Sequence, residues 1–349
     1  MDANENDDVM DDFRRYSLLR HNTFGIEAYC ARFLDFFSAE EVVAAVLRGD
    51  VTRPYFVLGA GSNVLLTGDY EGTVLHSSIR GIEAITPSCD DDSSGILLAC
   101  GSGETWDDVV RYCVENALYG TENLSGIPGD VGATAVQNVG AYGAEVSQLV
   151  YEVETIDLQT AECRVYDNAE CRYAYRHSVF KSMPGRYFVT RVTYRLSKTF
   201  VPNTSYGNIR AVLEEKGISR PTAQQLRSTV IEIRNAKIPD PKKEGNAGSF
   251  FVNPIVTRDI FAHIAERYPS VPSYPLPDGR VKVPAAWLIE QSGWKGKALG
   301  RATVSAKQPL VLVNSGGATG GDILALCDAV QTDVARLFGI ELQPEVNII

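Results

Sequence analysis

The sequence predicts an α/β protein of two or three domains, and three observations support this fold class. The chain has 349 residues, of which 44% are hydrophobic, enough for a substantial core. Short apolar runs of β-forming residues alternate along it with segments whose apolar residues have helical spacing. Two glycine-rich loops, 59–63 and 124–143, interrupt these elements. A protein of this class uses such loops to bring its backbone close to a ligand.

The first third of the chain predicts a strand–loop–strand unit. A short helix is expected at 40–47, and strands are expected at 55–58, 64–66 and 73–75. The first glycine-rich loop, 59–63, lies between two of these strands. This order differs from the strand–loop–helix order of a Rossmann unit, so we expect another kind of nucleotide-binding arrangement.

The middle of the chain predicts a further sheet. A strand is expected at 96–99. A helix capped by Thr105 is expected after it, because the apolar residues from Trp106 to Ala117 have helical spacing. The second glycine-rich loop, 124–143, follows this helix. Further strands are expected at 150–158, 163–166 and 187–196.

The composition changes near 200–221, where prolines and glycines are frequent. Thr222 and Gln225 form a predicted capping box for a helix that reaches about residue 236. Beyond it, a second α/β domain is expected, with Trp287 and Trp294 in its core. Its elements are helices at 258–267, 283–291 and 321–338 and strands at 310–313 and 341–349.

Charge and composition exclude several classes of protein. The net charge of −11 and the pI near 5.0 argue against nonspecific nucleic-acid binding. No apolar stretch approaches the ~18 residues of a membrane span. Seven cysteines, an odd number without a Cys-x-x-Cys motif, fit a reducing compartment. Residues 1–12 are acidic and unlike a signal peptide, so we expect a disordered tail on a cytoplasmic protein.

The loop 124–143 carries five glycines, one acid and no base. Glycine permits positive φ and removes the Cβ that would block a ligand. Successive main-chain N–H groups can then form a concave site for an anion such as a pyrophosphate. An ordinary glycine-rich turn is the alternative, which the second loop of the same kind makes less favoured.

Common catalytic signatures are absent from the sequence. It contains no Gly-x-Gly-x-x-Gly before a helix, no Walker sequence and no His-Glu-x-x-His. Its four histidines, His21, His76, His177 and His263, lie far apart. A metal site or a serine–histidine triad therefore has little support, and we expect no metal.

Three side chains stand out, each with a structural alternative. Ser249 follows three small residues and precedes a predicted aromatic strand, which suggests a hydroxyl in a dry pocket or a simple Gly-Ser turn. Arg176 lies among aromatic residues, where a guanidinium binds either an anionic ligand or a structural carboxylate. Glu345 is near the end of an apolar strand and is either a buried functional acid or an edge residue. Lys237, Lys282 and Lys295 can be diphosphate partners or surface residues.

Seven segments together resemble one family, the UDP-N-acetylenolpyruvoylglucosamine reductases, also called UDP-N-acetylmuramate dehydrogenases. The resemblance covers nearly the whole chain after the acidic tail. Tyr206, before the helix predicted at Thr222, matches the longer form, in which a mobile loop folds a tyrosine over the substrate. The segments are NTFG at 22–25, LGAGSN at 58–63, QNVGAYG at 137–143, YRHS at 175–178, NAGSFF at 246–251, AWLIE at 286–290 and PEV at 344–346.

The resemblance implies a two-part FAD-binding domain of the vanillyl-alcohol-oxidase type and a C-terminal α/β substrate domain. Its first part would comprise residues 13–85, with the final strand 345–349 returning to it. The second part would comprise 86–221, with the tyrosine loop near 200–210. The substrate domain would comprise 222–344.

The resemblance also implies the reaction. NADPH gives a hydride to FAD, and the reduced flavin passes a hydride to the vinyl carbon of an enolpyruvyl ether, giving UDP-N-acetylmuramate for peptidoglycan synthesis. Ser249 would be the proton donor, and Arg176 and Glu345 would stabilise or protonate the enolic intermediate. A fixed guanidinium in a dry site stabilises such charge, and a hydroxyl can protonate only a strongly basic carbon held close to it.

Ligand contacts follow from the same matching. No histidine or cysteine lies in the glycine-rich loops, so FAD is expected to be non-covalent. An arginine is often found where Asn347 stands, which leaves the packing of the last strand open. The cofactor residues are Gly59, Ala60, Gly61, Ser62, Asn63, Ser125, Gly126, Ile127, Pro128, Gly129, Gly132, Ala133, Asn138 and Gly140. The substrate residues are Tyr206, Lys237, Asn253, Tyr274, Lys295 and Gln308.

Two other functions fit parts of the pattern. One is another FAD oxidoreductase of the same fold, acting on a sugar alcohol or a lactone. The other is a flavin- or UDP-sugar-binding module without turnover. The joint presence of Ser249, Arg176 and Glu345 favours the reductase. We expect a monomer whose partners are small molecules, with neither nucleic acid nor membrane among them.

Overall fold

The computed structural model describes residues 10–85 and 95–349, which form two compact units. The first contains residues up to Tyr16, Cys30–Ala60 and Glu71–Arg234. The second contains Ser17–Tyr29, Gly61–Tyr70 and Asn235–Ile349. These units are defined by compactness alone, so the predicted division into cofactor and substrate domains stays a prediction.

The predicted disordered tail, 1–12, is wrong at its end, because the first strand begins at Asp11. Residues 1–9 lie outside the described part of the chain. Asp11 and Asp12 pair with the neighbouring strand in spite of their charge, because Arg32 on that strand binds the Asp12 carboxylate.

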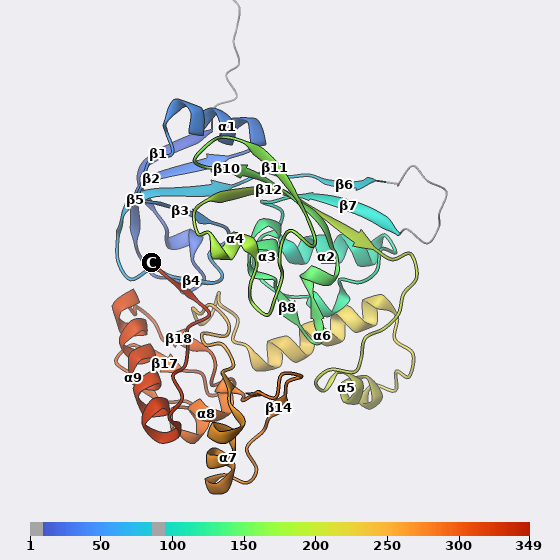
Figure 1. Cartoon of the computed structure of the whole chain (residues 1–349), viewed down its shortest axis with the longest axis vertical. Coiled ribbons are helices and arrows are strands. Elements are labelled where there is room, and N and C mark those ends of the chain that lie inside the picture. Colours follow the sequence, from blue (N-terminus) through green and yellow to red (C-terminus); the bar gives the residue numbers. More distant parts are fainter. Residues whose placement is uncertain (1–9, 86–94) are drawn as a thin grey trace, which may run out of the picture. The chain divides into compact units, whose positions relative to one another are not determined.

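The first unit contains a four-stranded sheet in the order β1-β2-β5-β3 (Figure 1). β3 runs parallel to β5, with Val57 opposite Leu75. Helix α1 begins after Ser38, whose side chain accepts from the Glu41 amide, and it buries Val42 and Ala45. The bounds are β1 Asp11–Ser17, β2 Tyr29–Phe36, α1 Ala39–Arg48, β3 Tyr55–Leu58 and β5 Tyr70–Ser77.

A five-stranded antiparallel sheet follows in the order β11-β10-β12-β7-β6. Two helices, α2 and α3, pack on one face of it (Figure 1), where Trp106 lies edge-on against Tyr194 with ring centroids 5.5 Å apart. Both side chains are fully buried. The bounds are β6 Ile82–Ile85, β7 Ile96–Gly101, α2 Trp106–Glu115, α3 Val131–Gln137, β10 Val150–Asp157, β11 Cys163–Asp167 and β12 Tyr187–Leu196.

Helix α3 lies inside the segment predicted as one long loop, 124–143, and so corrects that prediction. Val131 and Ala135, four residues apart, are both buried in the core of the sheet. Asp130 precedes the helix in an extended conformation, and Asn138 ends it with φ 44°. Packing of one apolar face therefore outweighs the low helix propensity of Gly132. A two-residue ladder, β8 Gly140–Ala141 with β9 Ala144–Glu145, follows.

The region 200–221 contains a helix that the sequence reading missed, α5 Ile209–Glu215. Ile209 and Leu213 bury themselves against Leu226 and Val230 of α6 Ala223–Lys237. The capping box of α6 is confirmed, because the Gln225 amide donates to Thr222 Oγ1 and the Thr222 amide donates to Gln225 Oε1. Thr105 precedes α2 as expected, but its side chain makes no capping bond. A one-turn helix, α4 Val179–Ser182, was also missed.

The second unit combines three helices with short strands. The last strand, β19, runs parallel to β4, with Asn347 opposite Val64, and Figure 1 shows the C-terminus beside β4. The bounds are β4 Val64–Leu65, β13 Ile255–Val256, α7 Arg258–Arg267, β14 Tyr274–Pro275, β15 Val281–Lys282, α8 Ala285–Gln291, β16 Ala298–Leu299, β17 Ala302–Val304, β18 Leu312–Asn314, α9 Gly320–Phe338 and β19 Asn347–Ile348.

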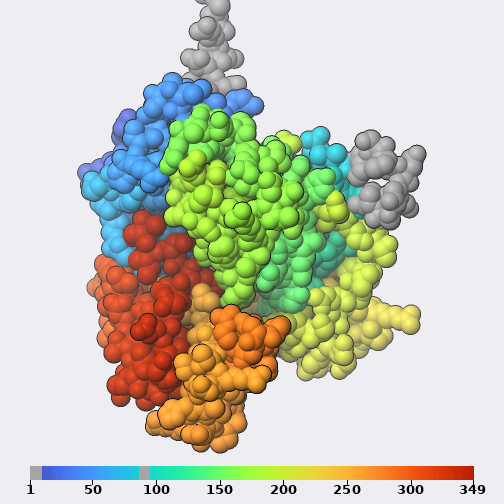
Figure 2. All heavy atoms as spheres, viewed as in Figure 1, coloured from blue at the N-terminus to red at the C-terminus, as the bar shows by residue number. Residues whose placement is uncertain are grey.

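The core of this unit joins distant parts of the chain. Phe24 and Leu65 pack with buried residues of α8 and α9, and Trp294 belongs to the same core, as predicted, with Trp287 partly buried against it. Figure 2 shows the C-terminal residues, in red, as a continuous surface. A Cβ at Gly320 would lie 1.8 Å from the Leu66 carbonyl oxygen, so only glycine fits there.

Among residues 10–85 and 95–349, no helix is long and apolar enough to cross a bilayer.

The aromatic strand expected after Ser249 is wrong as a regular strand, because Ser249 and Phe251 form only isolated bridges, to Val311 and Pro344. Each bridge partner belongs to a different segment, so the pairing has no room to extend.

Candidate active site

The two glycine-rich segments meet in the first unit. A Cβ at Gly59 would lie 3.0 Å from Asp130 Oδ2 and 3.7 Å from the Cβ of Ala133. The Ala60 amide donates to the Asp130 carboxylate. Burial raises the pKa of Asp130 to about 6, and the nearby His76 opposes this rise. Asp130, the only acid of the long loop, therefore contacts the short loop at Gly59 and Ala60.

The beginning of the long loop is fixed by a partly buried ion pair. Asp107 on α2 accepts from the Gly126 amide at 2.6 Å. The same carboxylate receives two bonds from Arg227 on α6, at 2.6 and 2.8 Å. Hydrogen bonds to charged groups contribute roughly 1.5–3 kcal/mol each. Gly126 has φ 70°, and a Cβ there would lie 3.3 Å from the Cδ atom of Arg234.

The end of the long loop is fixed by Asn138. Its amide nitrogen donates to Glu145 Oε2 at 3.0 Å and to the Ala174 carbonyl at 2.9 Å. Its oxygen accepts from the Ser147 amide at 3.1 Å. Asn138 was predicted as a cofactor residue, but its side chain is used within the protein, which leaves its main chain for any ligand.

The remaining cofactor residues divide between the units. Ser125 donates to the Glu122 carbonyl at 2.6 Å, and Gly129 has φ 126°. In the second unit, a Cβ at Gly61 would lie 1.9 Å from the His21 carbonyl oxygen. The space above Gly61 is therefore taken by the protein's own backbone, and a ligand is not needed to explain this glycine.

The first-unit residues fit a dinucleotide. Gly59, Gly126 and Gly132 have no side chain, and a Cβ at each would press on the protein's own atoms. Main-chain amides and small side chains suit a pyrophosphate. The residues that would hold FAD in this unit are thus 59–60, 125–129 and 132–133, together with 140.

Arg176 lies in a tight turn of the first unit. Ala174 and His177 exchange two main-chain hydrogen bonds around it, at 3.1 and 3.0 Å, and Arg176 itself has φ 53°. Its guanidinium donates to the Gly140 carbonyl at 3.3 Å and lies 5.8 Å from the Tyr175 ring. Ser178 then caps α4 and donates to the Val136 carbonyl at 2.6 Å. The turn is therefore attached to the end of the glycine-rich segment.

Ser249 and Glu345 lie on adjacent segments of the second unit. The Glu345 amide donates to the Phe250 carbonyl at 2.7 Å, and Phe251 pairs with Pro344. Ser249 follows Gly248, whose φ is 70° and whose amide donates to Asn246 Oδ1. Both functional side chains are half-buried. The structure therefore brings together two of the three predicted catalytic residues, while Arg176 belongs to the other unit.

Asn63 connects the first glycine-rich loop to the last strand. Its side chain donates to the Glu345 carbonyl at 3.2 Å. The Asn347 amide and side chain both donate to the Asn63 carbonyl at 3.1 Å. Asn347, which stands where an arginine was expected, is exposed and attaches the last strand to Asn63 by hydrogen bonds.

The predicted substrate residues are spread over several elements. Lys295 pairs with Glu290 at 2.7 Å, and Asn253 accepts from the Ala285 amide at 2.9 Å at the start of α8. Tyr274 on β14 is exposed, with the Lys282 ammonium 5.6 Å from its ring. Gln308 accepts from the Val311 amide through its carbonyl, and Lys237 ends α6. Tyr206 belongs to the first unit and is exposed.

Sequence reasoning missed three charged residues at the long loop. Asp107, Arg227 and Arg234 surround Gly126. Burial lowers the pKa of Arg234, and Tyr142 and Asp107 oppose that shift. The helical spacing of 227 and 234, seven residues apart on α6, was a signal that both lie on one face.

Residues 35–164 match the family described as "FAD binding domain". The chain is therefore a flavoprotein. Residues 240–349 match "UDP-N-acetylenolpyruvoylglucosamine reductase, C-terminal domain". The predicted FAD-binding fold with its C-terminal domain is thereby confirmed.

Curated relatives extend this match to the whole chain. The chain is 51% identical over 338 residues to the UDP-N-acetylenolpyruvoylglucosamine reductase of Bacteroides fragilis, covering 96% of this chain and 99% of the relative. It is 47% identical to that of Porphyromonas gingivalis, covering 97% of this chain and all of the relative. The chain therefore belongs to the UDP-N-acetylenolpyruvoylglucosamine reductase family.

A solved structure agrees in fold. The crystal structure of the reductase from Thermus caldophilus superposes with a TM-score of 0.67 at 23% identity, covering 97% of this chain and 98% of the other.

Proposed function

We propose that this protein reduces UDP-N-acetylglucosamine enolpyruvate to UDP-N-acetylmuramate in peptidoglycan precursor synthesis, with NADPH as the hydride donor. The observation that carries the proposal is identity near one half, along nearly the entire length of reductases with that name. The partners are small molecules. The protein acts as a cytoplasmic monomer, without nucleic acid or membrane.

FAD, when bound non-covalently, supplies hydride transfer between NADPH and the enolpyruvyl group. The residues that would hold it are 59–63, 125–129, 132–133, 138 and 140, with Ile127 and Pro128 among them. Hydride addition at the vinyl carbon leaves negative charge next to the substrate carboxylate. The Arg176 guanidinium stabilises that charge, because a fixed cation in a dry site needs no reorganisation.

Ser249 delivers the proton in this proposal. Gly248 fixes the hydroxyl at the end of a left-handed turn, and the neighbouring strand carries Glu345. A carboxyl beside the serine can restore its proton or orient it. The six predicted substrate residues, from Tyr206 to Gln308, bind the sugar nucleotide.

An anaerobic spectral titration tests the function. The purified protein should be yellow, lose its colour with NADPH and regain it when the UDP-enolpyruvyl sugar is added. Reoxidation by oxygen but not by the sugar nucleotide would instead indicate a sugar-alcohol or lactone oxidase. Colour that persists with NADPH would indicate a binding module without turnover.

Replacing the proposed proton donor separates the two half-reactions. Ser249→Ala should leave flavin reduction by NADPH within about twofold and slow reoxidation by the sugar nucleotide by at least 10²-fold, the scale of a positioned acid. Stopped-flow absorbance measures both rates. Ser292→Ala, whose hydroxyl only donates to the Leu288 carbonyl, is the control. Equal losses in both half-reactions for Ser249→Ala would mean that the serine only shapes the site.

A further inference from the structure

The last glycine of the long loop has a neighbour that is not a cofactor. Gly143 has φ 79°, and a Cβ there would lie 2.9 Å from the Cβ of Tyr206 and 3.4 Å from its Cγ. Contacts shorter than 3.0 Å are essentially absent from real Cβ atoms. Any side chain at 143 would therefore displace Tyr206. This glycine provides room for a residue of the loop 201–207.

A buried asparagine attaches that loop to the same turn. The Asn123 side chain is 4% exposed and donates to two carbonyls, Tyr142 at 2.8 Å and Asn203 at 3.0 Å. In return, the Asn203 side chain donates to the Gly143 carbonyl at 3.3 Å. The Asn203 oxygen accepts from the Ser205 hydroxyl at 2.9 Å. Two hydrogen bonds thus attach Asn203 to Asn123 and Gly143, and a third, from Ser205, lies within the segment next to Tyr206.

We propose that Asn123 and Gly143 form a seat for Tyr206, defined as the turn 142–143 and the Asn123 amide, and that this seat positions the tyrosine for the sugar nucleotide. The proposal rests on the proposed function, because Tyr206 is a substrate residue only there. Tyr206 itself is 54% exposed, while Asn203, three residues before it, is held by Asn123 and by the turn 142–143.

The physical role of the seat is to stabilise, within this mobile loop, the position in which Tyr206 meets the ligand. Ordering a loop and its side chains on binding costs affinity, and fixing them in advance reduces this cost. Asn123 is therefore a positioning residue, with no contact to the reacting atoms required. Loss of the seat should weaken sugar-nucleotide binding and leave the first half-reaction with NADPH unchanged.

Two variants remove the seat by different means. Gly143→Ala introduces the clash with Tyr206, and Asn123→Asp removes both amide donors while keeping the size of the side chain. Matched controls exist in the same unit. Gly217→Ala imposes a side chain at φ 71° with nothing within 4 Å. Asn168→Asp removes an amide that likewise donates to two carbonyls, Ser147 and Val150.

Chymotrypsin provides a readout that needs no ligand, since it cleaves after Tyr206 when the loop opens. Native-state cleavage there should accelerate about tenfold in both seat variants and stay within twofold in both controls. Cleavage rates equal to those of the wild type in Gly143→Ala and Asn123→Asp would overturn the seat.

Sugar-nucleotide affinity provides the second readout, measured by perturbation of the flavin spectrum. Both seat variants should bind about tenfold more weakly, with NADPH reduction rates within twofold of the wild type. Gly143→Ala should have no further effect in a Tyr206→Ala background. An undiminished affinity, or the same loss in that background, would overturn the positioning role. A wild-type protein that binds no sugar nucleotide would contradict the proposed function, and cleavage alone would then decide on the seat.

Discussion

At the scale of single residues, Asp130 is the group whose charge is most affected by the fold near the cofactor loops. The Asp130 carboxylate lies next to Gly59 and accepts a hydrogen bond from the Ala60 amide, which explains why a polar residue occupies position 130. Burial raises its pKa from 3.8 to about 6. At neutral pH the folded protein therefore carries a carboxylate that would be more stable in water.

This shift predicts a pH-dependent gain for Asp130→Asn. The folded pKa lies above the unfolded one, so the folded state binds the proton more tightly, and the contribution of this group to stability increases as pH falls from about 7 to 4. An amide is neutral throughout, so the variant should be more stable than the wild type by about 3 kcal/mol at pH 7.5 and by only about 1 kcal/mol at pH 4.5. Urea unfolding at both pH values measures the difference.

The control for this variant is Asp108→Asn, which removes a charge from an aspartate 48% exposed on α2. It should change stability by less than about 0.5 kcal/mol at either pH. A larger gain for Asp130→Asn at pH 4.5 than at pH 7.5 would contradict the assignment.

The candidate site could be predicted from sequence only where a residue type itself carries the signal. Ser249 and Glu345 were identified by resemblance, and their adjacency depends on a main-chain bond between residues 250 and 345, which no local pattern indicates. The left-handed turn at Arg176 and the pair of Asp107 with Arg227 also depend on tertiary contacts. Arg176 was singled out by its aromatic neighbours and by the resemblance, whereas Asp107 and Arg227, of types common at surfaces, carried no such signal.

At the scale of elements, local patterns were sufficient where they were long. The strand at 187–196 and the helix at 258–267 have the predicted bounds, because alternation or helical spacing continues over each whole element. The short strand at 55–58 also has its predicted bounds, as a run of apolar β-forming residues that ends at the glycine-rich loop. Helices α3 and α5 were missed, since each is only seven residues long and stands in a glycine- or proline-rich segment. Burial of one or two side chains decides such short helices, and burial is a tertiary property.

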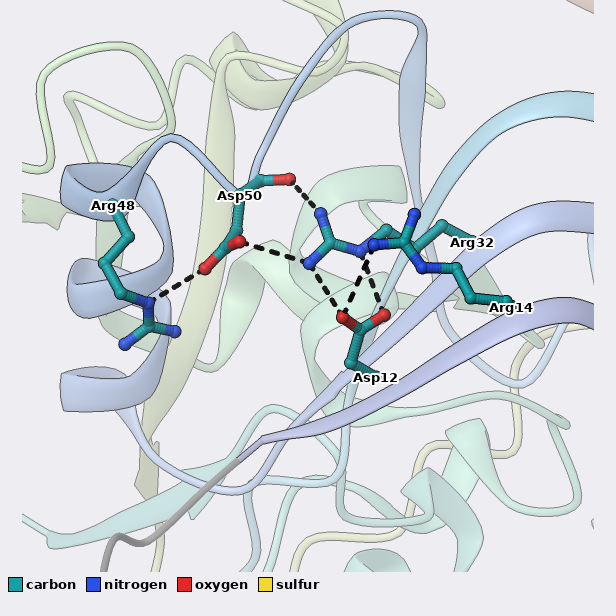
Figure 3. A network of polar contacts seen from close by, with 5 residues as sticks. All are labelled: Asp12, Arg14, Arg32, Arg48 and Asp50. Atoms are coloured by element: carbon teal, nitrogen blue, oxygen red, sulfur yellow. Dashed lines mark hydrogen bonds and ion pairs between the residues drawn. The ribbon is translucent and has the colours of Figure 1, made fainter.

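The first strand depends on a charge network between neighbouring elements. Arg32 on β2 binds both Asp12 carboxylate oxygens at 2.9 Å and the Asp50 carbonyl at 2.8 Å, while Arg48 binds Asp50 (Figure 3). Hydrogen bonding from Arg32 lowers the pKa of Asp12. A lowered carboxyl pKa adds stability at neutral pH that is lost as pH falls below about 4.

Replacing the central arginine should therefore release β1. Arg32→Met keeps the stem of the side chain and removes its hydrogen bonds, and we expect a loss of about 2 kcal/mol in the free energy of unfolding at pH 7. The loss should shrink below about pH 4. Urea titrations provide both values. Arg14→Met is the control within the same network, because Arg14 is 72% exposed and 3.8 Å from Asp12, and it should cost under about 0.5 kcal/mol. Equal losses for the two variants would show that Arg32 has no special role.

At the scale of the whole molecule, the predicted fold class holds, but the chain is more interleaved than a linear reading suggests. The second unit takes two short segments, Ser17–Tyr29 and Gly61–Tyr70, from the N-terminal third. Each contributes to its structure: Phe24 enters its core, and β4 pairs with β19. Composition changes mark boundaries between consecutive segments only, so the change near 200–221 did not indicate these two N-terminal segments. The resemblance did imply that the final strand 345–349 returns to the part 13–85, and β19 pairs there with β4.

This interleaving predicts that the C-terminal part cannot fold alone. A fragment of residues 235–349 lacks Phe24, Ile26 and Leu65, three core residues that are at most 2% exposed in the full chain. It also lacks β4, the strand with which β19 pairs. Removing large core side chains costs roughly 2–5 kcal/mol each, and the free energy of unfolding of a small domain is only about 5–15 kcal/mol.

Circular dichroism and proton–nitrogen NMR of the fragment should show no cooperative unfolding and little amide dispersion. The full chain, measured in parallel, should show both. A fragment that unfolds cooperatively and has dispersed amide signals would mean that the unit folds without the N-terminal segments.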